Sequence, residues 1–589
     1  MCGIIGYIGT KNATPILFNG LKRLEYRGYD SAGIVTLDKE FHMKKDVGKV
    51  DEINTRLNFS DLPGTLGIAH TRWATHGGVT KENAHPHTDC EGKIAVVHNG
   101  IIENYQELKK NLVSNGHKFK SQTDTEVIPH LIEEIMKRGK NFHDSTLSAL
   151  RSLEGSYAIL ALHKNERKIV AARKGSPLVI GVADGSYFAA SDIPAFLEHT
   201  KNVVYMHDSD VALLTDTGMK VFSLLEGGDV NRKVDTVDWD IRQAEKGEFN
   251  HFMLKEISEQ VETVQKAVQQ TKEVVDGVVH SIRNAHGIFL IASGTSYHAC
   301  LAASYILSKL NKMHVNVVLA SEFPHYEHFL TPKTLVVAVS QSGETADVLE
   351  AVKYAKARGC KILSIVNVVG SSLTRTSDSF LNLNAGPEIC VLATKSYTSQ
   401  LALFTLLAYA LSGKLEEGKK RLNYLWNVIY HLTSATVKEK IKELAEKLKN
   451  KEHIFLIGRG LEYTTALEAA LKIKEVSYIH AEAFAGGELK HGPIALVEDG
   501  TPCIVFVSEE TEKEILSNAN EIKSRGGYII GVSPTNNEVF DFWLKVPEAN
   551  NENPIVQIIP IQILAYQLAV LRGLDPDHPR NLAKSVTVK

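Results

Sequence analysis

The sequence lacks closely spaced cysteine pairs, which are typical of disulfide-rich domains and of zinc sites. Its six cysteines are instead scattered over the 589 residues, at Cys2, Cys90, Cys300, Cys360, Cys390 and Cys503. We therefore expect neither a disulfide framework nor a metal site. Because unpaired thiols persist in reducing compartments, the cytoplasm is the predicted location.

An excess of charge is also missing, since 66 lysines and arginines face 69 acidic residues and the net charge is −3. This excludes the basic excess of a general nucleic-acid or anionic-membrane binder. The longest apolar stretch, around 401–411, is interrupted by Thr405 and falls short of the ~18 residues that a membrane-spanning helix needs. The first residues, MCGIIGYIGT, lack the basic segment and cleavage pattern of a signal peptide. We expect no nucleic-acid and no membrane partner.

What is present is a chain of ordinary globular composition, with 43% hydrophobic and 23% charged residues. Its length predicts three or four domains, at roughly 100–200 residues each. Residues 1–225 contain short apolar runs that end in polar residues and glycine, as strands do when they deliver groups to a site. Residues 226–284 are polar, charged and increasingly helical, which predicts a strandless linker and a leading helix.

From residue 285 onward the pattern of strand, glycine- or serine-rich turn and helix repeats. Matching positions lie 166 residues apart for Ile291 and Ile457, and 168 apart for Ser340 and Ser508. A single long offset indicates a duplicated domain, and alternating strands and helices predict parallel sheets covered on both faces. The expected boundaries are 285–425 for the first copy, 450–575 for the second and 576–589 for a tail.

Cys2 is the first candidate catalytic residue. Removal of the initiator Met would leave a thiol beside an α-amine, whose pKa near 7.7–8.0 lets it accept the thiol proton. For Cys2 alone, a small hydrophobic residue at the start of a strand is the more common explanation.

Five motifs alter that balance, because MCGIIGYIG, LEYRGYDSAGI, HTRWATHG, HNGIIENY and TDTE follow one another over the first 126 residues. This order resembles the class II glutamine amidotransferase domain, an α+β N-terminal-nucleophile hydrolase fold with layered αββα architecture that releases ammonia from glutamine. The resemblance implies that Cys2 is the nucleophile and that Asn99 and the Gly100 amide stabilise the oxyanion. It further implies a set of glutamine-binding residues: Arg72 for the α-carboxylate, Asp124 for the α-ammonium, and Trp73, Thr75 and His76 in a closing loop.

The second constellation is VVAVSQSGET, a strand that ends in a hydroxyl-rich turn before a helix. Hydroxyls, glycine and free amides at a helix N-terminus can hold a phosphate, although serine and threonine also favour plain helix caps. A similar turn, SGTS at 293–296, follows the first strand of the same copy. Both resemble the sugar isomerase (SIS) domain, an α/β doubly wound parallel sheet. The implied phosphate ligands are Thr295, Ser296, Ser340, Gln341, Ser342 and Thr345.

The equivalent turn of the second copy reads Ser508-Glu509-Glu510-Thr511. Its two carboxylates would repel phosphate, so we expect one sugar-phosphate site per chain.

The third group is LKIKEVSYIHAEAFAGGELKHGP at 471–493, in which Lys472 and Glu475 share a helical face. From spacing alone, this is a helical ion pair followed by a loop histidine. With the tail PRNLAKSVTV, however, the segment resembles the isomerase half of the glucosamine-6-phosphate synthase family, and the resemblance runs from Cys2 to Val588.

The resemblance implies conversion of fructose 6-phosphate and glutamine to glucosamine 6-phosphate and glutamate, the first step of the hexosamine pathway. Ammonia would pass internally between two sites, without cofactor or metal, in a homodimer. Lys584 would form a Schiff base with the sugar, His491 would assist ring opening, and Glu475 would move a proton between C1 and C2 beside Lys472.

The resemblance also places Glu388 and Val391 at the sugar. One departure is Ala393, which stands where related enzymes commonly have serine; it has no hydroxyl, so any sugar contact at this position would come from its backbone.

Two other readings remain open. The first is another class II amidotransferase, of the phosphoribosylamine-, asparagine- or glutamate-forming types; the absence of an SGGxDS nucleotide loop, of a phosphoribosyl-binding strand end and of an iron–sulfur cysteine set argues against these. The second is a sugar-phosphate sensor without catalysis. A sensor needs no base and no Schiff-base lysine, so the joint presence of Glu475, His491 and Lys584 disfavours it.

Overall fold

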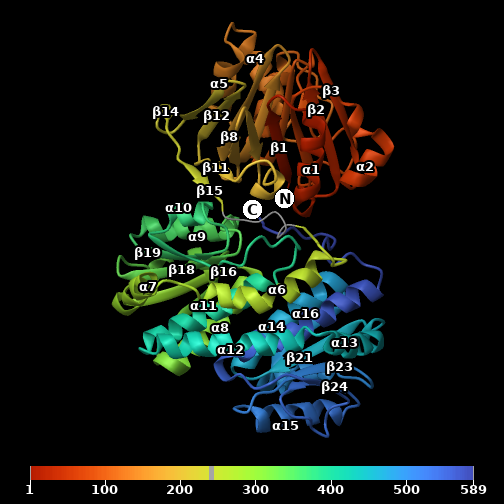
Figure 1. Cartoon of the computed structure of the whole chain (residues 1–589), viewed down its shortest axis with the longest axis vertical. Helices are drawn as coiled ribbons and strands as arrows, with labels where there is room; N and C mark the ends of the chain where they lie inside the picture. The colour runs from red at the N-terminus through yellow and green to blue at the C-terminus, as the bar shows by residue number, and fades with distance from the viewer. Residues whose placement is uncertain (1, 238–244, 588–589) are drawn as a thin grey trace. The chain divides into compact units, whose positions relative to one another are not determined.

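The computed structural model describes residues 2–237 and 245–587, which divide by contact into two units, 1–245 with 583–589 and 246–582 (Figure 1). The expected tail of 576–589 is thus divided between the units. The expected linker of 226–284 contains two short strands, and its residues 238–244 lie outside the described part of the chain. Those strands have three residues each, too few to show an alternating pattern in the sequence.

The first unit contains two stacked antiparallel sheets. Within the described residues, the eight-stranded sheet has the order β15 (Val234–Thr236), β11 (Asn202–Tyr205), β9 (Val179–Ala183), β10 (Ser186–Ala190), β1 (Gly3–Ile8), β4 (Leu66–Arg72), β2 (Ser31–Leu37) and β3 (Phe41–Val47). The seven-stranded sheet has the order β14 (Gly228–Val230), β13 (Gly218–Ser223), β12 (Asp210–Thr215), β8 (Glu166–Lys174), β7 (Gly155–His163), β6 (Ile94–Ile102) and β5 (His87–Thr88).

Helices cover the outer face of each sheet, which completes four layers. They are α1 (Ala13–Leu24), α2 (Val50–Leu57), α3 (Tyr105–Ser114), α4 (Val127–Met136) and α5 (Phe142–Arg151). The alternation along β6 shows how the sequence specifies the layers: Ala95 and Val97 enter the core between the sheets, whereas Ile94 and Val96 pack under α4. The αββα prediction is confirmed.

The second unit contains two parallel sheets of the same strand order. The first is β17 (Asn316–Leu319), β16 (Gly287–Ala292), β18 (Thr334–Ser340), β19 (Lys361–Val366) and β20 (Ser379–Asn382). The second is β22 (His480–Ala485), β21 (His453–Gly458), β23 (Pro502–Phe506), β24 (Tyr528–Ser533) and β25 (Phe542–Lys545). The doubly wound prediction and the duplication are confirmed.

Long helices fill the space between these two sheets (Figure 1). The helices of the unit are α6 (Phe252–Ala267), α7 (Lys272–Asn284), α8 (Gly294–Asn311), α9 (Ala346–Ala357), α10 (Ser372–Thr376), α11 (Lys395–Leu411), α12 (Leu415–Leu432), α13 (Ala435–Leu448), α14 (Leu461–Ser477), α15 (Glu512–Lys523) and α16 (Asn553–Leu571). One core cluster joins both sheets: Leu290 of β16 and Leu456 of β21 belong to it together with Ile559 of α16.

The longest apolar helix is α16, not the stretch around 401–411 that the sequence analysis singles out. By length and composition α16 is the one helix among the described residues that could cross a membrane, yet 83% of its apolar window is buried inside the protein. It is therefore a core helix, made uniformly apolar because neighbouring helices surround it.

Candidate functional site

Cys2 lies at the start of β1, the strand that pairs with β4. The antiparallel register sets Gly3 opposite Thr71, so the chain beyond β4 passes beside Cys2. The Trp73 N–H donates to Cys2 Sγ at 3.2 Å. A Cβ on Gly3 would lie 2.7 Å from Leu24 Cβ, which explains why glycine follows the cysteine.

Burial raises the pKa of the Cys2 thiol above its ordinary value. The Trp73 N–H and the Arg72 guanidinium act in the opposite direction, because both stabilise a thiolate. The thiol is thus held protonated until a base removes its proton, as expected for a nucleophile that depends on a neighbouring amine.

Asn99, on β6 of the other sheet, reaches the same point. Its Nδ2 donates to the Cys2 carbonyl oxygen at 2.8 Å. His70 Nε2 lies 3.1 Å from Asn99 Oδ1 and 3.0 Å from the His98 carbonyl oxygen. Since both partners are acceptors, Nε2 carries the proton, and burial lowers the pKa of His70 to about 3, so the ring is neutral. His70 therefore fixes the Asn99 amide with its NH2 group toward Cys2.

Gly100 has a φ of +127°, and a Cβ there would lie 1.9 Å from the Ser156 carbonyl oxygen. Only glycine fits this position, which keeps the Gly100 backbone beside Asn99 in the conformation seen here.

Arg72 and Asp124, the predicted charge clamp, are both buried. Arg72 donates to the carbonyl oxygens of Gly78 at 3.1 Å and Gly77 at 3.2 Å, and also to that of His76. Asp124 accepts the Ile102 N–H at 2.8 Å. The guanidinium is therefore oriented by the 76–78 segment.

The predicted closing loop after β4 is exposed at Thr75 and half-buried at Trp73 and His76. Asp30, which sequence reasoning missed, accepts the Ala74 N–H at 2.9 Å and so anchors the start of the loop. Tyr29 meets the Trp73 ring edge-on, with centroids 5.6 Å apart. Asp30 and His70 both stand inside the quoted motifs, but nothing in the residue type marked their roles.

In the second unit, the turn after β18 forms a compact cradle. Ser340 Oγ accepts the Gly343 N–H at 3.0 Å and lies 2.9 Å from Thr345 Oγ1, at the start of α9. The Glu344 N–H donates to Ser342 Oγ at 3.2 Å. Gly343 has a φ of +65°, and a Cβ there would lie 2.1 Å from Ser371 Oγ.

The second hydroxyl-rich turn follows β16, the parallel neighbour of β18. Because β17 lies on one side of β16 and β18 on the other, the strand order reverses between β16 and β18, and ligands of such sheets bind at this reversal. Ser296 Oγ accepts from Gln400 Nε2 at 2.9 Å.

Thr295 connects this turn to the second copy. Its Oγ1 donates to Glu468 Oε1 at 3.1 Å and accepts from Lys472 Nζ at 3.0 Å, both on α14. His298, one turn further along α8, lies 2.7 Å from Glu468 Oε2. The Thr295 hydroxyl is therefore bound within the protein, so its phosphate role falls to the backbone amide and remains a prediction.

Lys472 joins two carboxylates on one face of α14. Its Nζ lies 2.7 Å from Glu475 Oε2 and 3.3 Å from Glu468 Oε1. Burial alone would lower the pKa of Lys472, but the two carboxylates outweigh it and raise the pKa. The lysine is thus a fixed cation and not a proton acceptor.

Burial raises the pKa of Glu475, and the Lys472 cation opposes this rise. The Glu475 side chain keeps 19% of its surface exposed, whereas the Glu468 side chain is fully buried. An accessible carboxylate with a raised pKa beside a hydroxyl-rich turn is suited to general acid–base work. Sequence reasoning missed Glu468 and His298, although Glu468 lies four residues before Lys472 on the same face.

Glu388 is buried and caps α11 by accepting the Thr394 and Ser396 N–H groups, each at 3.0 Å. Val391 is also buried, and its N–H donates to the Asp577 carbonyl at 3.2 Å. Their predicted contacts with the sugar stay predictions. The same holds for His491, exposed at the end of a 3₁₀ segment (Gly486–His491), and for Lys584, which the contacts group with the first unit.

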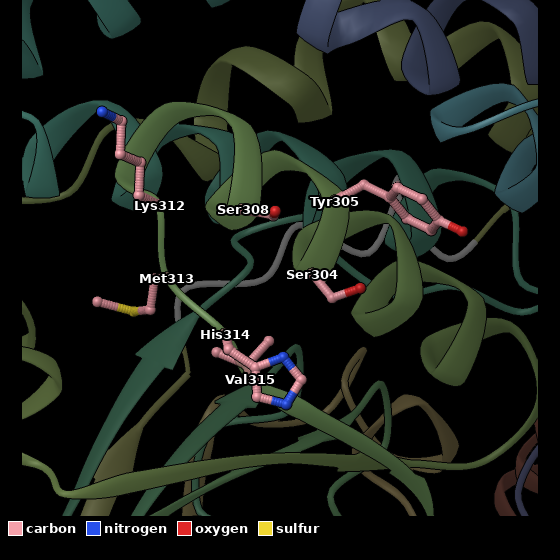
Figure 2. A pocket seen from close by; sticks show the side chains of 7 residues that line it. All are labelled: Ser304, Tyr305, Ser308, Lys312, Met313, His314 and Val315. Carbon is pink, nitrogen blue, oxygen red and sulfur yellow. The ribbon is translucent and has the colours of Figure 1, made fainter.

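A surface hollow of the second unit lies away from this site. A hollow of about 570 Å³ lies along the far half of α8 and the turn before β17, and Figure 2 shows the side chains around it. Ser304 and Ser308 come from α8, and Lys312 and His314 from the turn. The predicted cradle adjoins the opposite end of this helix, so the hollow is a separate surface feature.

Family models match both units. The SIS domain model matches residues 281–410 and 447–572, and the glutamine amidotransferase domain model matches 70–198.

Full-length relatives share this organisation. The chain is 47% identical to glutamine–fructose-6-phosphate aminotransferase [isomerizing] of Pyrococcus horikoshii and 48% identical to the protein of that name from Thermococcus kodakarensis, each over 100% of both chains.

Solved structures resemble the second unit. The C-terminal domain of glucosamine-fructose-6-phosphate aminotransferase from Francisella tularensis matches with a TM-score of 0.53 and 36% identity, covering 57% of this chain and 99% of that one. Tagatose-6-phosphate ketose/aldose isomerase from Escherichia coli shares the fold, with a TM-score of 0.50 and 18% identity over 57% of this chain and 96% of that one. Given the full-length identity and the matching domain order, the chain belongs to the glutamine–fructose-6-phosphate aminotransferase (isomerizing) family.

Proposed function

We propose that this protein transfers the amide nitrogen of glutamine to fructose 6-phosphate and isomerises the product to glucosamine 6-phosphate. The observation that carries the proposal is the Lys472–Glu475 pair on α14, which is joined through Thr295 to a hydroxyl-rich turn at the strand reversal. The site at which Cys2 lies beside the Asn99 amide would release the nitrogen from glutamine.

At the glutamine site, Cys2 Sγ attacks the side-chain amide carbon and the α-amine exposed by loss of Met1 takes the thiol proton. Asn99 Nδ2 and the Gly100 N–H stabilise the oxyanion of the tetrahedral intermediate. Collapse of this intermediate releases ammonia and leaves a thioester, which water hydrolyses to glutamate. Arg72 and Asp124 hold the charged α-groups, and Trp73, Thr75 and His76 close over them.

At the sugar site, the phosphate lies against Ser340, Gln341, Ser342 and Thr345, with the amides around Thr295 and Ser296. His491 assists ring opening, and Lys584 forms a Schiff base with the C2 carbonyl. Ammonia displaces the lysine and gives an imine at C2.

Glu475 then removes a proton from C1 and returns it to C2, while the C1 hydroxyl proton passes to the nitrogen. The product is the C1 aldehyde bearing an amine at C2, so atoms balance without an oxidant. The fixed Lys472 cation holds the Glu475 carboxylate during this transfer.

The test is to incubate the full chain with glutamine and fructose 6-phosphate and to follow glutamate and amino-sugar phosphate by mass spectrometry. We expect matched amounts of the two products. Cys2→Ala should lose glutamine-dependent synthesis and regain it with added ammonia. Lys584→Ala should make no amino sugar from either nitrogen source, whereas Lys545→Ala, an exposed lysine elsewhere, should behave like the wild type.

Glutamate without amino sugar from the wild type would show that the acceptor is wrong. Neither product would favour a sugar-phosphate sensor. We further propose a cytoplasmic homodimer, for which light scattering on the purified protein should give twice the mass of the chain.

A further inference from the structure

Four side chains that the glutamine site does not use converge on one point of the first unit. Cys90 lies in the turn between β5 and β6, His117 follows α3, and His130 and Glu133 are three residues apart on α4. One ligand atom from each lies within 4.8 Å of all the others. His117, His130 and Glu133 are buried, whereas Cys90 is on the exposed side.

Five of the six separations between these atoms are close to those of a tetrahedron around zinc. Cys90 Sγ lies 3.7 Å from His117 Nδ1 and 3.5 Å from His130 Nδ1, and the two Nδ1 atoms are 3.3 Å apart. Glu133 Oε2 lies 3.1 Å from His117 Nδ1 and 3.5 Å from His130 Nδ1. With Zn–S near 2.3 Å and Zn–N near 2.0–2.1 Å, a tetrahedral ion places S and N roughly 3.5 Å apart and two N atoms roughly 3.3 Å apart.

Outer contacts also match those of metal ligands. His117 Nε2 lies 3.2 Å from Glu134 Oε2, and His130 Nε2 lies 3.6 Å from Glu126 Oε1. The Glu134 carboxylate, within hydrogen-bond distance of His117 Nε2, favours a proton on that nitrogen and leaves His117 Nδ1 without one, whereas Glu126 is a neighbour of His130 beyond hydrogen-bond distance. The Lys118 N–H donates to Cys90 Sγ at 3.4 Å, a contact that stabilises a thiolate.

We propose that Cys90, His117, His130 and Glu133 bind a structural zinc ion in the amidotransferase unit. Thiolate, imidazole and carboxylate together suit Zn²⁺ better than Mg²⁺ or Ca²⁺, which prefer oxygen ligands alone. Four protein ligands leave no open position, so the ion would hold the fold and not activate water.

The ion would act on the glutamine site through the segment between His117 and His130. Glu126 accepts the N–H groups of Lys120 at 2.7 Å and Ser121 at 2.6 Å, so it fixes the backbone just before Asp124. Zinc would tie both ends of that segment to Cys90. We therefore expect its loss to loosen the residue that receives the α-ammonium of glutamine.

The sequence analysis expects no metal site because it finds no close cysteine pair. The four ligands come instead from three separate segments, between residues 90 and 133. Only the fold brings them together.

The test is metal analysis of the full-length protein, purified under reducing conditions from zinc-supplemented medium. We expect a single zinc ion per chain, absent from Cys90→Ser and His130→Ala. Cys360→Ser, which removes a buried cysteine of the other unit, is the matched control and should keep its zinc. After chelation, Co²⁺ should give the absorption of a tetrahedral thiolate-bound ion in the wild type and lose the thiolate band in Cys90→Ser.

Chelation should also lower the melting temperature by several degrees, with recovery on adding zinc, since binding to the folded state stabilises it. In the enzyme assay, which rests on the proposed function, the zinc-free protein should show a raised KM for glutamine and unchanged ammonia-dependent synthesis. Wild-type protein without zinc and without the Co²⁺ band would overturn the proposal and leave a hydrogen-bonded cluster. Zinc kept equally by both ligand variants would overturn it too, and would place the ion elsewhere.

Discussion

The two α/β copies of the second unit have the same strand order but different chemistry in their turns. After β18 the first copy has the turn Ser340–Thr345, rich in hydroxyls, whereas after β23 the second has Ser508–Thr511 with Glu509 and Glu510. In both turns a serine and a threonine hydroxyl meet, at 2.9 Å and 3.1 Å. The carboxylates, not the frame, separate an anion cradle from a turn that repels anions.

The helix that follows the first strand also differs between the two copies, and here it is the second copy that carries the proposed catalytic groups. In the first copy α8 contributes a threonine and a histidine that hold Glu468, whereas in the second copy α14 carries Lys472 and Glu475. One copy thus provides binding groups and the other provides the proposed base. Under the proposed function, duplication followed by such a division would explain how one sugar site can need two domains.

The largest effect is expected from removing the base. Glu475→Gln should lower amino-sugar formation roughly 10²- to 10⁴-fold, the usual contribution of a general base, while glutamine hydrolysis continues. Glu510→Gln, in the second-copy turn, is the matched control and should leave both activities near the wild-type level. Both activities are read from glutamate and amino-sugar phosphate by mass spectrometry. Equal losses in the two variants would show that the copies are not divided as described.

A smaller effect should follow from the paired serines. Ser340→Ala removes a hydroxyl of the proposed cradle, and a hydrogen bond to a charged group contributes about 1.5–3 kcal/mol. Because about 1.4 kcal/mol corresponds to a tenfold change in affinity, the KM for fructose 6-phosphate should rise roughly 10- to 100-fold. Ser508→Ala should leave that KM unchanged. A rise with the second variant alone would place the phosphate in the second copy.

A glycine with positive φ in each copy allows the two copies to be compared by the stability of their alanine variants. Gly343 and Gly460 both have positive φ, +65° and +55°, so alanine is strained at each. A Cβ at Gly343 would also lie 2.1 Å from Ser371 Oγ, whereas the nearest atom at Gly460 is 4.0 Å away. Gly343→Ala should therefore lower the melting temperature by a few degrees more than Gly460→Ala. Calorimetry on the two variants decides this, and equal melting temperatures would contradict it.

The smallest effect is a shift of the pH profile. Burial raises the pKa of Glu475, and a carboxylate acts as a base only when ionised, so sugar isomerisation should fall as the pH decreases through this raised pKa. Lys472→Met removes the cation that opposes the rise, and the acid limb should then move to higher pH. Rates with ammonia as nitrogen source, taken across pH at equal concentrations of free NH3, separate this limb from the glutamine site. An acid limb that does not move in Lys472→Met would mean that a group other than Glu475 causes it.

The duplication and the strand-end turns could be predicted because they depend on local patterns that repeat, whereas the four layers of the first unit followed from the resemblance to a known domain family. Lys472 and Glu475 were paired correctly from their spacing of three on a helix. Glu468 and His298 were missed because their contact joins α8 to α14 across 170 residues, and no pattern in the sequence encodes it. The apolar length of α16 was overlooked in favour of a shorter run.

Other features could not be read from the sequence either, because they depend on contacts between distant segments or on strands too short to show a pattern. The contacts of the Thr295 hydroxyl with α14 could not be foreseen from its place after a strand, and its role as a phosphate ligand stays a prediction. The strands β14 and β15 were hidden because edge strands of three residues carry polar side chains. The group around Cys90 was invisible because each ligand is common and distant from the next in the chain.

The position of α16 has a consequence for the order of events on the ribosome. This helix packs against α13 and α14 and shares the core that joins both sheets, yet it is synthesised after those helices and after the strands of both sheets. Residues 1–245, the N-terminal part of the unit that holds Cys2, can fold while the second unit is still incomplete, since domains fold in the order of synthesis. Until α16 emerges, the apolar sides of α13 and α14 have no cover, and the face that carries Lys472 and Glu475 is not fixed. A nascent chain therefore acquires its ammonia source before its ammonia acceptor.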